Sequence, residues 1–403
     1  MTPGAPVTPA DREGVLTINA GSSSLKVAAF HGGSLERLGG VEVSELGRAA
    51  VLTSSIAGQH RTAALPGASD HEAALAAVFD CLAHELGPRD WLAVGHRVTH
   101  GRDRADPRIL DPALCDALEA LVPLAPLHQP HNLAGIAAAT RLAPHALQVA
   151  CFDTSFHRTM PEVARRYALP RALSAEGIEA YGFHGLSYEY IASILPAHLG
   201  DRADGRVIVA HLGSGASMCA MRNRRSVATT MGLTPLDGLP MATRAGAIDP
   251  GVVLYLLAER GLTVDQVRDL LYGQSGLLGV SELSGSMKQL VGSDDPRAVE
   301  AVELFVYRAA AAIGALAAAL GGLDAVVFTG GIGEHSAPIR TAISRKIAWL
   351  GATLDERAHA AGQAVFSTPA SALALCTLPT DEEVVLARHA AAMWRRRAQG
   401  DRG

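Results

Sequence analysis

The chain has 403 residues, of which 48% are hydrophobic and 19% are charged, and its formal net charge is −5. This composition is typical of a globular protein with enough residues for two domains, and it excludes the basic surface of a nucleic-acid-binding protein. The longest apolar run, 309–323, is too short to span a bilayer. Five scattered cysteines, and no apolar signal core in a leader of residues 1 to about 14, favour a soluble cytoplasmic protein without a membrane or nucleic-acid partner.

The first predicted element is a hairpin over 16–30, in which two apolar strands flank the polar turn Gly21-Ser22-Ser23-Ser24. Backbone N–H groups in such a turn form a concave anion site, to which the hydroxyls and Lys26 add donors and a positive charge. An ordinary hairpin turn without a ligand explains the pattern equally well.

Further along the chain, strands and helices alternate. Apolar residues at helical spacing predict a helix over 69–87, which Gly87-Pro88 ends. Helices are also expected over 130–142, 184–195 and 298–320, and strands over 91–97, 147–153, 207–213, 325–331 and 373–379. This alternation predicts an α/β architecture with mixed or parallel sheets.

Two stretches about half a chain apart share one pattern. In 16–30 and in 207–221, an apolar strand, a Gly-Ser turn and a second apolar strand follow one another, so that Asn19 corresponds to His211. A third Gly-rich turn, 328–335, follows another apolar run. We therefore expect two related halves, with a nucleotide held by the turns in a cleft between two domains.

The two commonest nucleotide-binding loops are absent from the sequence. None of the three lysines stands in a Walker A loop, and the segments GSGASM and GIGEHS lack the third glycine of the dinucleotide fingerprint. These absences leave the duplicated actin-like ATPase architecture.

Nine blocks resemble, in the same order, the acetate/propionate kinase family. They are INAGSSSLK, GHRVTHG, PLAPLHQPHNL, CFDTSFHRTMP, YGFHGLSY, HLGSGAS, MGLTPLDGLPMATRAGAIDPG, FTGGIGEH and TDEEVVLAR. The resemblance implies a duplicated actin-like fold (sugar kinase/Hsp70/actin, ribonuclease H-like) with an interdomain cleft. It implies an N-terminal domain of 1–156 plus 385–403, and a nucleotide-binding and dimerisation domain of 157–384. It also implies a homodimer that transfers the γ-phosphoryl group of ATP to acetate, reversibly, with Mg²⁺ or Mn²⁺.

Two arginines are candidates for binding the carboxylate and the moving phosphoryl group. Arg97 and Arg244 stand in apolar, Gly/Ala-rich surroundings, where a lone guanidinium is costly unless it is paired. A guanidinium suits a carboxylate and a planar phosphoryl group, but a structural ion pair with an Asp is an equal alternative on the residues alone. The resemblance implies that both are catalytic.

Five of the 16 histidines are candidates for the site or for a metal, and they fall into three groups. The resemblance implies that His184 stabilises charge on the phosphoryl group, and that His128 and His211 support it. His96 and His100 are four residues apart in a strand-like stretch without a third ligand in view, which makes a zinc site a poor interpretation.

Asn19, Asp153 and Glu382 offer the oxygen ligands that Mg²⁺ prefers. The resemblance implies a metal role for Asn19 and Glu382 and a catalytic role for Asp153. Helix capping by Asp153, and a favourable charge at a helix N-terminus for Glu382, are the alternatives. Glu382 and Glu383 point in different directions on a helix, so we expect only Glu382 to face the site.

The remaining site residues follow from the resemblance alone. An acyl pocket is implied at Thr99, Leu127, Phe183 and Pro235, next to Arg97. Nucleotide contacts are implied at Ser24, Lys26, His211, Leu212, Gly213, Ser214, Gly215, Ser286, Met287, Lys288, Gly330, Gly331, Ile332 and Gly333.

The chain departs from the family pattern at several positions. Ser214 replaces Asn, Ala247 replaces Asp, and Thr99 replaces the Val of the acyl pocket. In the block GVSELSGSMK, Ser286 replaces an Asp that holds the ribose in the family, and Lys288 replaces an Arg. These differences leave nucleotide affinity and acyl preference open.

Three other functions compete with acetate phosphorylation. Propionate kinase differs by one methylene of substrate, worth roughly 1–3 kcal/mol in a pocket. A non-catalytic nucleotide-binding paralogue is disfavoured because the candidate catalytic residues are all present. A sugar kinase would need an Asp base to activate a hydroxyl, whereas a carboxylate is already ionised.

Overall fold

The computed structural model describes residues 12–400, which form two compact units. Unit 1 contains the chain up to Ser155 and from Asp381 onward, and unit 2 contains Phe156–Thr380. The sequence had placed these boundaries after residues 156 and 384. Residues 1–11 of the expected leader lie outside the described part, and the first strand already begins at Glu13.

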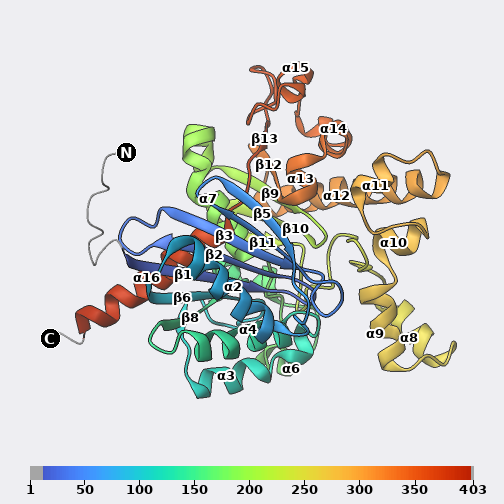
Figure 1. Ribbon diagram of the computed structural model, residues 1–403. Coiled ribbons are helices and arrows are strands. Elements are labelled where there is room, and N and C mark those ends of the chain that lie inside the picture. Colours follow the sequence, from blue (N-terminus) through green and yellow to red (C-terminus); the bar gives the residue numbers. More distant parts are fainter. Residues whose placement is uncertain (1–11, 401–403) are drawn as a thin grey trace. The chain divides into compact units, whose positions relative to one another are not determined.

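Unit 1 contains an eight-stranded mixed sheet in the order β5-β4-β3-β2-β1-β6-β8-β7 (Figure 1). β1, β6 and β8 run parallel, and the other neighbours are antiparallel. The strands are β1 (Glu13–Ala20), β2 (Leu25–His31), β3 (Arg37–Ser44), β4 (Val51–Ile56), β5 (Gln59–Ala64), β6 (Asp90–Val98), β7 (Arg108–Ile109) and β8 (Leu147–Phe152).

Helices cover both faces of this sheet. α2 (His71–Leu86) and α4 (Gln129–Leu142) pack on one face, and α3 (Pro112–Glu119) packs beside α4. On the other face lies α16 (Glu382–Gly400), where a methyl group on Gly95 of β6 would come within 2.7 Å of the Leu386 carbonyl. Glycine therefore permits the close approach of the last helix to the first domain's sheet.

Unit 2 contains a five-stranded sheet in the order β11-β10-β9-β12-β13. The strands are β9 (Arg206–Leu212), β10 (Ala216–Arg222), β11 (Arg225–Thr229), β12 (Ala325–Thr329) and β13 (Ala374–Thr377). The helices are α5 (Glu162–Arg165), α6 (Arg171–Ala175), α7 (Gly185–Leu199), α8 (Pro250–Ala258), α9 (Val264–Gly273), α10 (Gly276–Ser281), α11 (Met287–Val291), α12 (Pro296–Leu320), α13 (Gly330–His335), α14 (Ala337–Lys346) and α15 (Glu356–Ala360).

The two sheets share one strand order. β3-β2-β1-β6-β8 of unit 1 corresponds to β11-β10-β9-β12-β13 of unit 2, with the same antiparallel and parallel neighbours. The repeated hairpin opens each sheet, which confirms the two related halves. The predicted strand 325–331 is too long, because Gly330 has a φ of +76° and opens α13.

Within residues 12–400, only α12 is long and apolar enough to cross a membrane by length and composition. It is longer than the apolar run 309–323, because it begins at Pro296. One face, which includes Phe305 and Ile313, is buried in the hydrophobic core of unit 2. Such packing accounts for the apolar composition of a core helix.

Candidate active site

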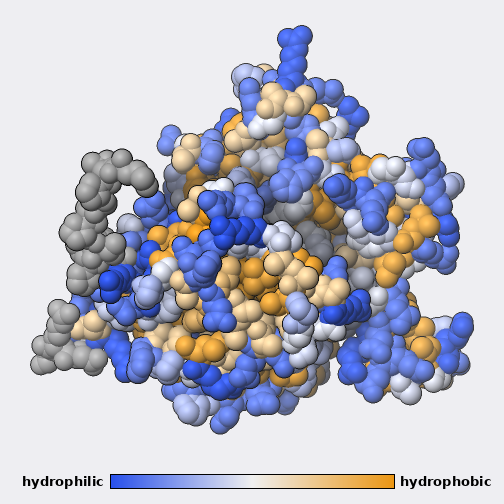
Figure 2. Space-filling view, viewed as in Figure 1, coloured by the Kyte–Doolittle hydropathy of each residue, from blue (hydrophilic) through white to orange (hydrophobic). Residues whose placement is uncertain are grey.

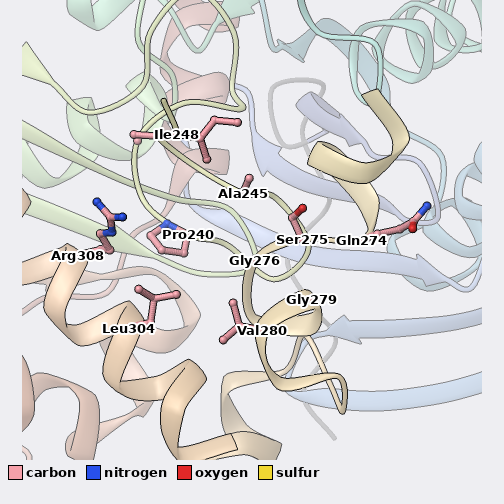
Figure 3. Close-up of a pocket in the computed structure, with 12 residues that line it drawn as sticks. Pro240, Ala245, Ile248, Gln274, Ser275, Gly276, Gly279, Val280, Leu304 and Arg308 are labelled. Atoms are coloured by element: carbon pink, nitrogen blue, oxygen red, sulfur yellow. The ribbon is translucent and has the colours of Figure 1, made fainter. Parts of the chain in front are cut away.

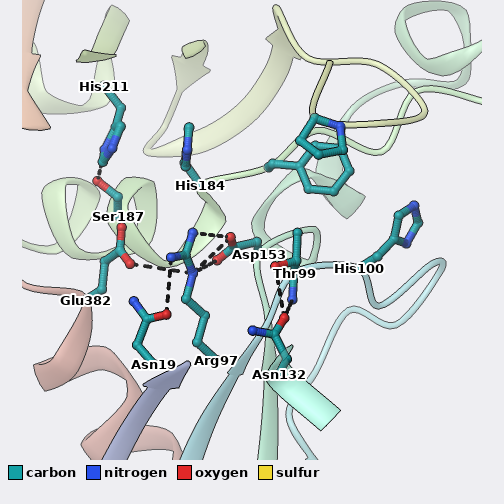
Figure 4. A network of polar contacts seen from close by, with 12 residues as sticks. Asn19, Arg97, Thr99, His100, Asn132, Asp153, His184, Ser187, His211 and Glu382 are labelled. Carbon is teal, nitrogen blue, oxygen red and sulfur yellow. Dashed lines mark hydrogen bonds and ion pairs between the residues drawn. The ribbon is translucent and has the colours of Figure 1, made fainter. Parts of the chain in front are cut away.

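A cluster of charged side chains lies where two parallel strands of unit 1 end. Arg97 lies near the end of β6, and Asp153 directly follows the neighbouring β8. The Arg97 Nη2 donates to Asp153 Oδ2 over 2.6 Å, and Nε lies 3.1–3.2 Å from both carboxylate oxygens (Figure 4). Asp153 is 1% exposed, so its carboxylate is shielded from water. The ion pair considered for Arg97 therefore exists.

Two further oxygen-bearing side chains lie beside Arg97. Glu382 Oε2 is 3.7 Å from its Nε, and Asn19 Oδ1, at the end of β1, is 3.5 Å from its Nη1. Burial would lower the pKa of Arg97, but the carboxylates of Asp153 and Glu382 outweigh burial and raise that pKa above its usual value. Arg97 thus stays charged and holds three possible ligand groups together.

Three consecutive acidic residues at the start of α16 have different partners. Asp381 accepts a hydrogen bond from the Val384 N–H, so Asp381 satisfies the helix terminus. Glu383 is ion-paired with Arg37 at 2.6 Å, away from Arg97. Glu382 is therefore the acidic residue of this turn that joins the Arg97 cluster.

The first hairpin turn is polar and open. Gly21 N–H donates to the Ser24 carbonyl over 2.8 Å, and Ser22 and Ser23 are exposed. Lys26 lies on the exposed side of β2, with Nζ 3.6 Å from Glu42. The Lys26 ammonium is therefore ion-paired with a residue of the neighbouring strand β3.

Thr99 directly follows β6 and stands two residues after Arg97. Residues two apart in an extended chain point to the same side of the sheet. Its hydroxyl and its backbone N–H both donate to Asn132 Oδ1 over 3.0 Å, and Asn132 donates to the Ala20 carbonyl. Of the other expected groups nearby, Leu127 is 43% exposed and His128 precedes the first residue of α4. The Thr99 hydroxyl is therefore turned toward protein.

The histidines His96 and His100 serve the fold. His96 is buried against Gln148, and desolvation lowers its pKa to about 4. His100 Nδ1 accepts from the Arg102 N–H. In the described part of the chain, no group of three His, Cys, Asp or Glu side chains is arranged to hold a metal.

A second cluster, in unit 2, consists of hydrogen bonds around two histidines. His184 precedes α7 with a φ of 57°, and its ring stacks on that of His211 with centroids 4.3 Å apart (Figure 4). His211 Nδ1 bonds the Ser187 hydroxyl over 2.9 Å, and Ser187 donates to Thr380. His184 Nδ1 bonds Ser217 over 2.8 Å.

His184 and Arg244 converge on the second Gly-rich turn. A methyl group on Gly215 would lie 3.2 Å from Arg244 Nη2 and 3.3 Å from His184 Nε2. Arg244 Nη1 donates to the Pro235 carbonyl over 2.7 Å, a bond that orients the guanidinium without neutralising its charge. Two donors therefore point at one glycine of a turn that also contains exposed Ser214.

The third Gly-rich turn lies next to the second. A methyl group on Gly213 would be 3.9 Å from the Gly331 N, and one on Gly330 would be 2.9 Å from the Leu212 carbonyl. Glu334 Oε1 accepts from the N–H groups of Gly330 and Thr380. The two turns thus form one region at the ends of β9 and β12.

Other expected contact residues have contrasting exposure. The side chains of Phe183, Leu212 and Met287 are buried in the core of unit 2. Ser286 and Lys288 are exposed at the start of α11. Glu282, the carboxylate of the same block GVSELSGSMK, is exposed and ion-paired with Arg297 at 3.5 Å.

A separate cavity of about 330 Å³ in unit 2 contains none of the expected site residues (Figure 3). Ala247, where the family pattern has Asp, lies on its wall together with Pro240, Ile248, Leu304 and Arg308.

Sequence reasoning missed the residues that hold the site together. Asn132, Ser187, Ser217, Tyr188, Glu334 and Thr380 bond the expected residues or their neighbours. Ser187, Tyr188 and Ser217 stand inside the blocks YGFHGLSY and HLGSGAS, so their place next to the two histidines was the available signal.

Two sheets that share the order of five strands, each with a polar hairpin turn after its first strand in the chain, define a duplicated actin-like ATPase fold. The acetokinase family model matches residues 14–388, and the chain belongs to the acetokinase family. It is therefore a kinase.

Known proteins agree with this assignment. An acetate kinase of Rhodopseudomonas palustris (strain TIE-1) is 50% identical over 392 residues, covering 94% of this chain and 98% of that protein. Among solved structures, Porphyromonas gingivalis acetate kinase is 33% identical with a TM-score of 0.83, and a Francisella tularensis propionate kinase is 32% identical with a TM-score of 0.89. Each of these two alignments covers 94% of this chain and 99% of the other.

Proposed function

We propose that the protein transfers the γ-phosphoryl group of ATP to acetate, reversibly, giving acetyl phosphate and ADP. The proposal rests on the arrangement of charged side chains in a chain of the acetokinase family. Arg97 is ion-paired with Asp153 and Glu382, and Arg244 and His184 converge on Gly215. In-line phosphoryl transfer requires mainly such positioning and charge stabilisation. The name of the 50% identical relative favours acetate over propionate.

In this proposal Arg97 orients the acetate carboxylate, and Asp153 fixes the guanidinium for that task. Arg244 and His184 donate to the oxygens of the moving phosphoryl group, where each donor removed costs about 100-fold or more in rate. His211 supports His184 by ring stacking, and His128 supports the acyl side. The acetate carboxylate is already ionised, so no general base is needed.

Asn19 and Glu382 would hold Mg²⁺ or Mn²⁺. They supply only oxygen donors, which fits a cation that keeps several waters and phosphate oxygens among its ligands. When bound, the cation neutralises charge on the phosphate oxygens.

ATP is the co-substrate in this proposal. Backbone groups of the second and third turns, Gly213–Gly215 and Gly330–Gly333, contact its phosphates and adenosine, with Ser24 and Lys26 facing the phosphates. The buried side chains of Leu212 and Met287 restrict those residues to backbone contacts. The family resemblance assigns the acyl pocket to Thr99 and Leu127 of unit 1 and to Pro235 and Phe183 of unit 2, where Phe183 is buried in the core.

We also propose that the protein is a cytoplasmic homodimer. The apolar helix α8 has no buried residue in the single chain, and Val252, Leu254 and Tyr255 are 44–67% exposed. Figure 2 shows apolar residues among polar ones on the surface of this region. A second copy would remove this apolar surface from water. Leu254→Asp should convert the dimer to a monomer in light scattering.

One assay tests the activity. Acyl phosphate trapped as hydroxamate would be measured with acetate, propionate and butyrate, each crossed with ATP, GTP and pyrophosphate. The proposal requires ATP-dependent hydroxamate from acetate, with a higher kcat/KM than from propionate. Absence of hydroxamate from acetate overturns it, and higher kcat/KM for propionate makes the protein a propionate kinase.

A further inference from the structure

A chain of hydrogen bonds runs from the core of unit 2 to His184. The Tyr188 hydroxyl lies 2.6 Å from Ser217 Oγ, which lies 2.8 Å from His184 Nδ1. Tyr188 stands one helical turn after His184 on α7, and Ser217 stands on β10. Tyr188 and Ser217 are both 0% exposed, so water does not compete for these bonds.

The direction of the protons follows from the tyrosine. Burial raises the pKa of Tyr188 well above its usual value, so the hydroxyl keeps its proton. The backbone of His211 lowers that pKa in turn, which is the effect of an N–H directed at the phenolic oxygen. The Tyr188 proton is then directed to Ser217, and the Ser217 proton to His184 Nδ1.

A neutral imidazole that accepts at Nδ1 carries its hydrogen on Nε2. That nitrogen faces Gly215, at 3.3 Å from the position of an added methyl group, and Arg244 Nη2 lies 3.2 Å from the same position. The opposite tautomer would present a lone pair to an anion at the turn. Stacking on His211 fixes the plane of the ring as well.

We propose that Tyr188 and Ser217 are positioning residues that hold neutral His184 with its hydrogen on Nε2, as a donor to an anionic oxygen at Gly215. The identity of that oxygen, on the transferred phosphoryl group, rests on the proposed function. The tautomer of His184 does not depend on the proposed function.

The first test is nitrogen NMR of the full-length protein labelled with ¹⁵N-histidine, at a pH where histidines are neutral. His184→Gln assigns the His184 signals. We expect a protonated Nε2 and an unprotonated Nδ1 in the wild type, and averaged nitrogen shifts in Ser217→Ala. A wild-type His184 protonated on Nδ1 overturns the proposal, whether or not the protein phosphorylates acetate.

The second test separates positioning from stability. Ser217→Ala should lower kcat at least tenfold with KM for ATP and acetate within about threefold, because the donor acts mainly on the transition state. Tyr188→Phe leaves the Ser217 hydroxyl in place and should lower kcat less.

Ser344→Ala is the matched control, because Ser344 is also a buried serine of unit 2 and its Oγ bonds no described group. It should leave kcat unchanged. Wild-type kcat and wild-type ¹⁵N shifts in Ser217→Ala overturn the proposal. Normal ¹⁵N shifts in the wild type without hydroxamate from acetate overturn the proposed function instead.

Discussion

At the end of its first strand, unit 1 carries Asn19 beside an ion-paired cluster, whereas unit 2 carries His211 in a hydrogen-bond network with Ser187 and Thr380. The strand order beneath the two is the same. In unit 1, Arg97 is surrounded by carboxylates. In unit 2, Arg244 is oriented by a carbonyl, and hydroxyls orient the histidines.

Because of this difference, substitutions in the two units should affect stability and activity differently. Removing one partner of a buried ion pair strands the other charge and costs about 3–5 kcal/mol of folding free energy. Removing one neutral hydrogen bond costs only about 1 kcal/mol. Substitutions in unit 1 should therefore lower both stability and turnover, and those in unit 2 mainly turnover.

Arg97→Ala and Arg244→Ala should have the largest effects, each lowering kcat by at least ~100-fold, or about 2.7 kcal/mol. Only Arg97→Ala removes an ion-pair partner of the buried Asp153 carboxylate, so it should also lower the free energy of unfolding by about 3 kcal/mol. Steady-state kinetics and urea denaturation measure the two quantities. Wild-type kcat in either variant contradicts the role of that arginine, and equal stability losses contradict the comparison.

Glu382→Ala should reduce Mg²⁺-dependent activity about 10–100-fold more than Glu383→Ala, because Glu383 is paired with Arg37 instead of Arg97. Initial rates over a Mg²⁺ titration measure the effect. Glu383→Ala is the matched control on the same helical turn. Equal losses in the two variants would mean that the helix terminus, and not one ligand, is required.

Gly215→Ala should lower kcat about tenfold while the melting temperature stays close to that of the wild type. The new methyl group forces Arg244 Nη2 and His184 Nε2 to shift by a few tenths of an ångström, and small misplacements of catalytic groups are costly. Gly273→Ala, where no atom lies within 4 Å of an added methyl group, is the control. An unchanged kcat in Gly215→Ala would show that the two donors do not act at this turn.

Nucleoside selectivity should be weak, with ATP, GTP and ITP used within about tenfold of one another. Exposed Ser286 offers a neutral hydrogen bond where a carboxylate would supply about 1.5–3 kcal/mol. Ser286→Asp should lower the KM for ATP with little change in kcat. Tight, selective ATP binding in the wild type, unaltered by Ser286→Asp, rules this explanation out.

Thr99→Val should have the smallest effect, with the acetate KM within about threefold of the wild type. The Thr99 hydroxyl already donates to Asn132, so valine keeps the shape and loses about 1 kcal/mol of stability from one buried bond. Kinetics with acetate and propionate, together with urea denaturation, measure this. A large rise in acetate KM would show that the hydroxyl contacts substrate.

Much of this arrangement is visible in the sequence, because strand ends and turns are local. The repeated hairpins predicted the two sheets, and Arg97 and Asp153 follow from two strand-like runs with polar ends. The partners of the site are not local: Ser187 bonds Thr380, 193 positions away, and Thr99 bonds Asn132 on α4, 33 positions away. Burial of Met287 likewise depends on tertiary packing, and the resemblance carried no information about it.

The return of α16 to the first sheet also bears on the order in which the protein is made. The ribosome completes 156–380 before it synthesises α16, so unit 2 has all its residues while unit 1 still lacks a helix. Until then the face of β6 that carries Gly95 has no cover, and Arg97 lacks Glu382. The nascent first domain therefore matures last, and Glu382 joins the Arg97 cluster only when the C-terminal helix docks.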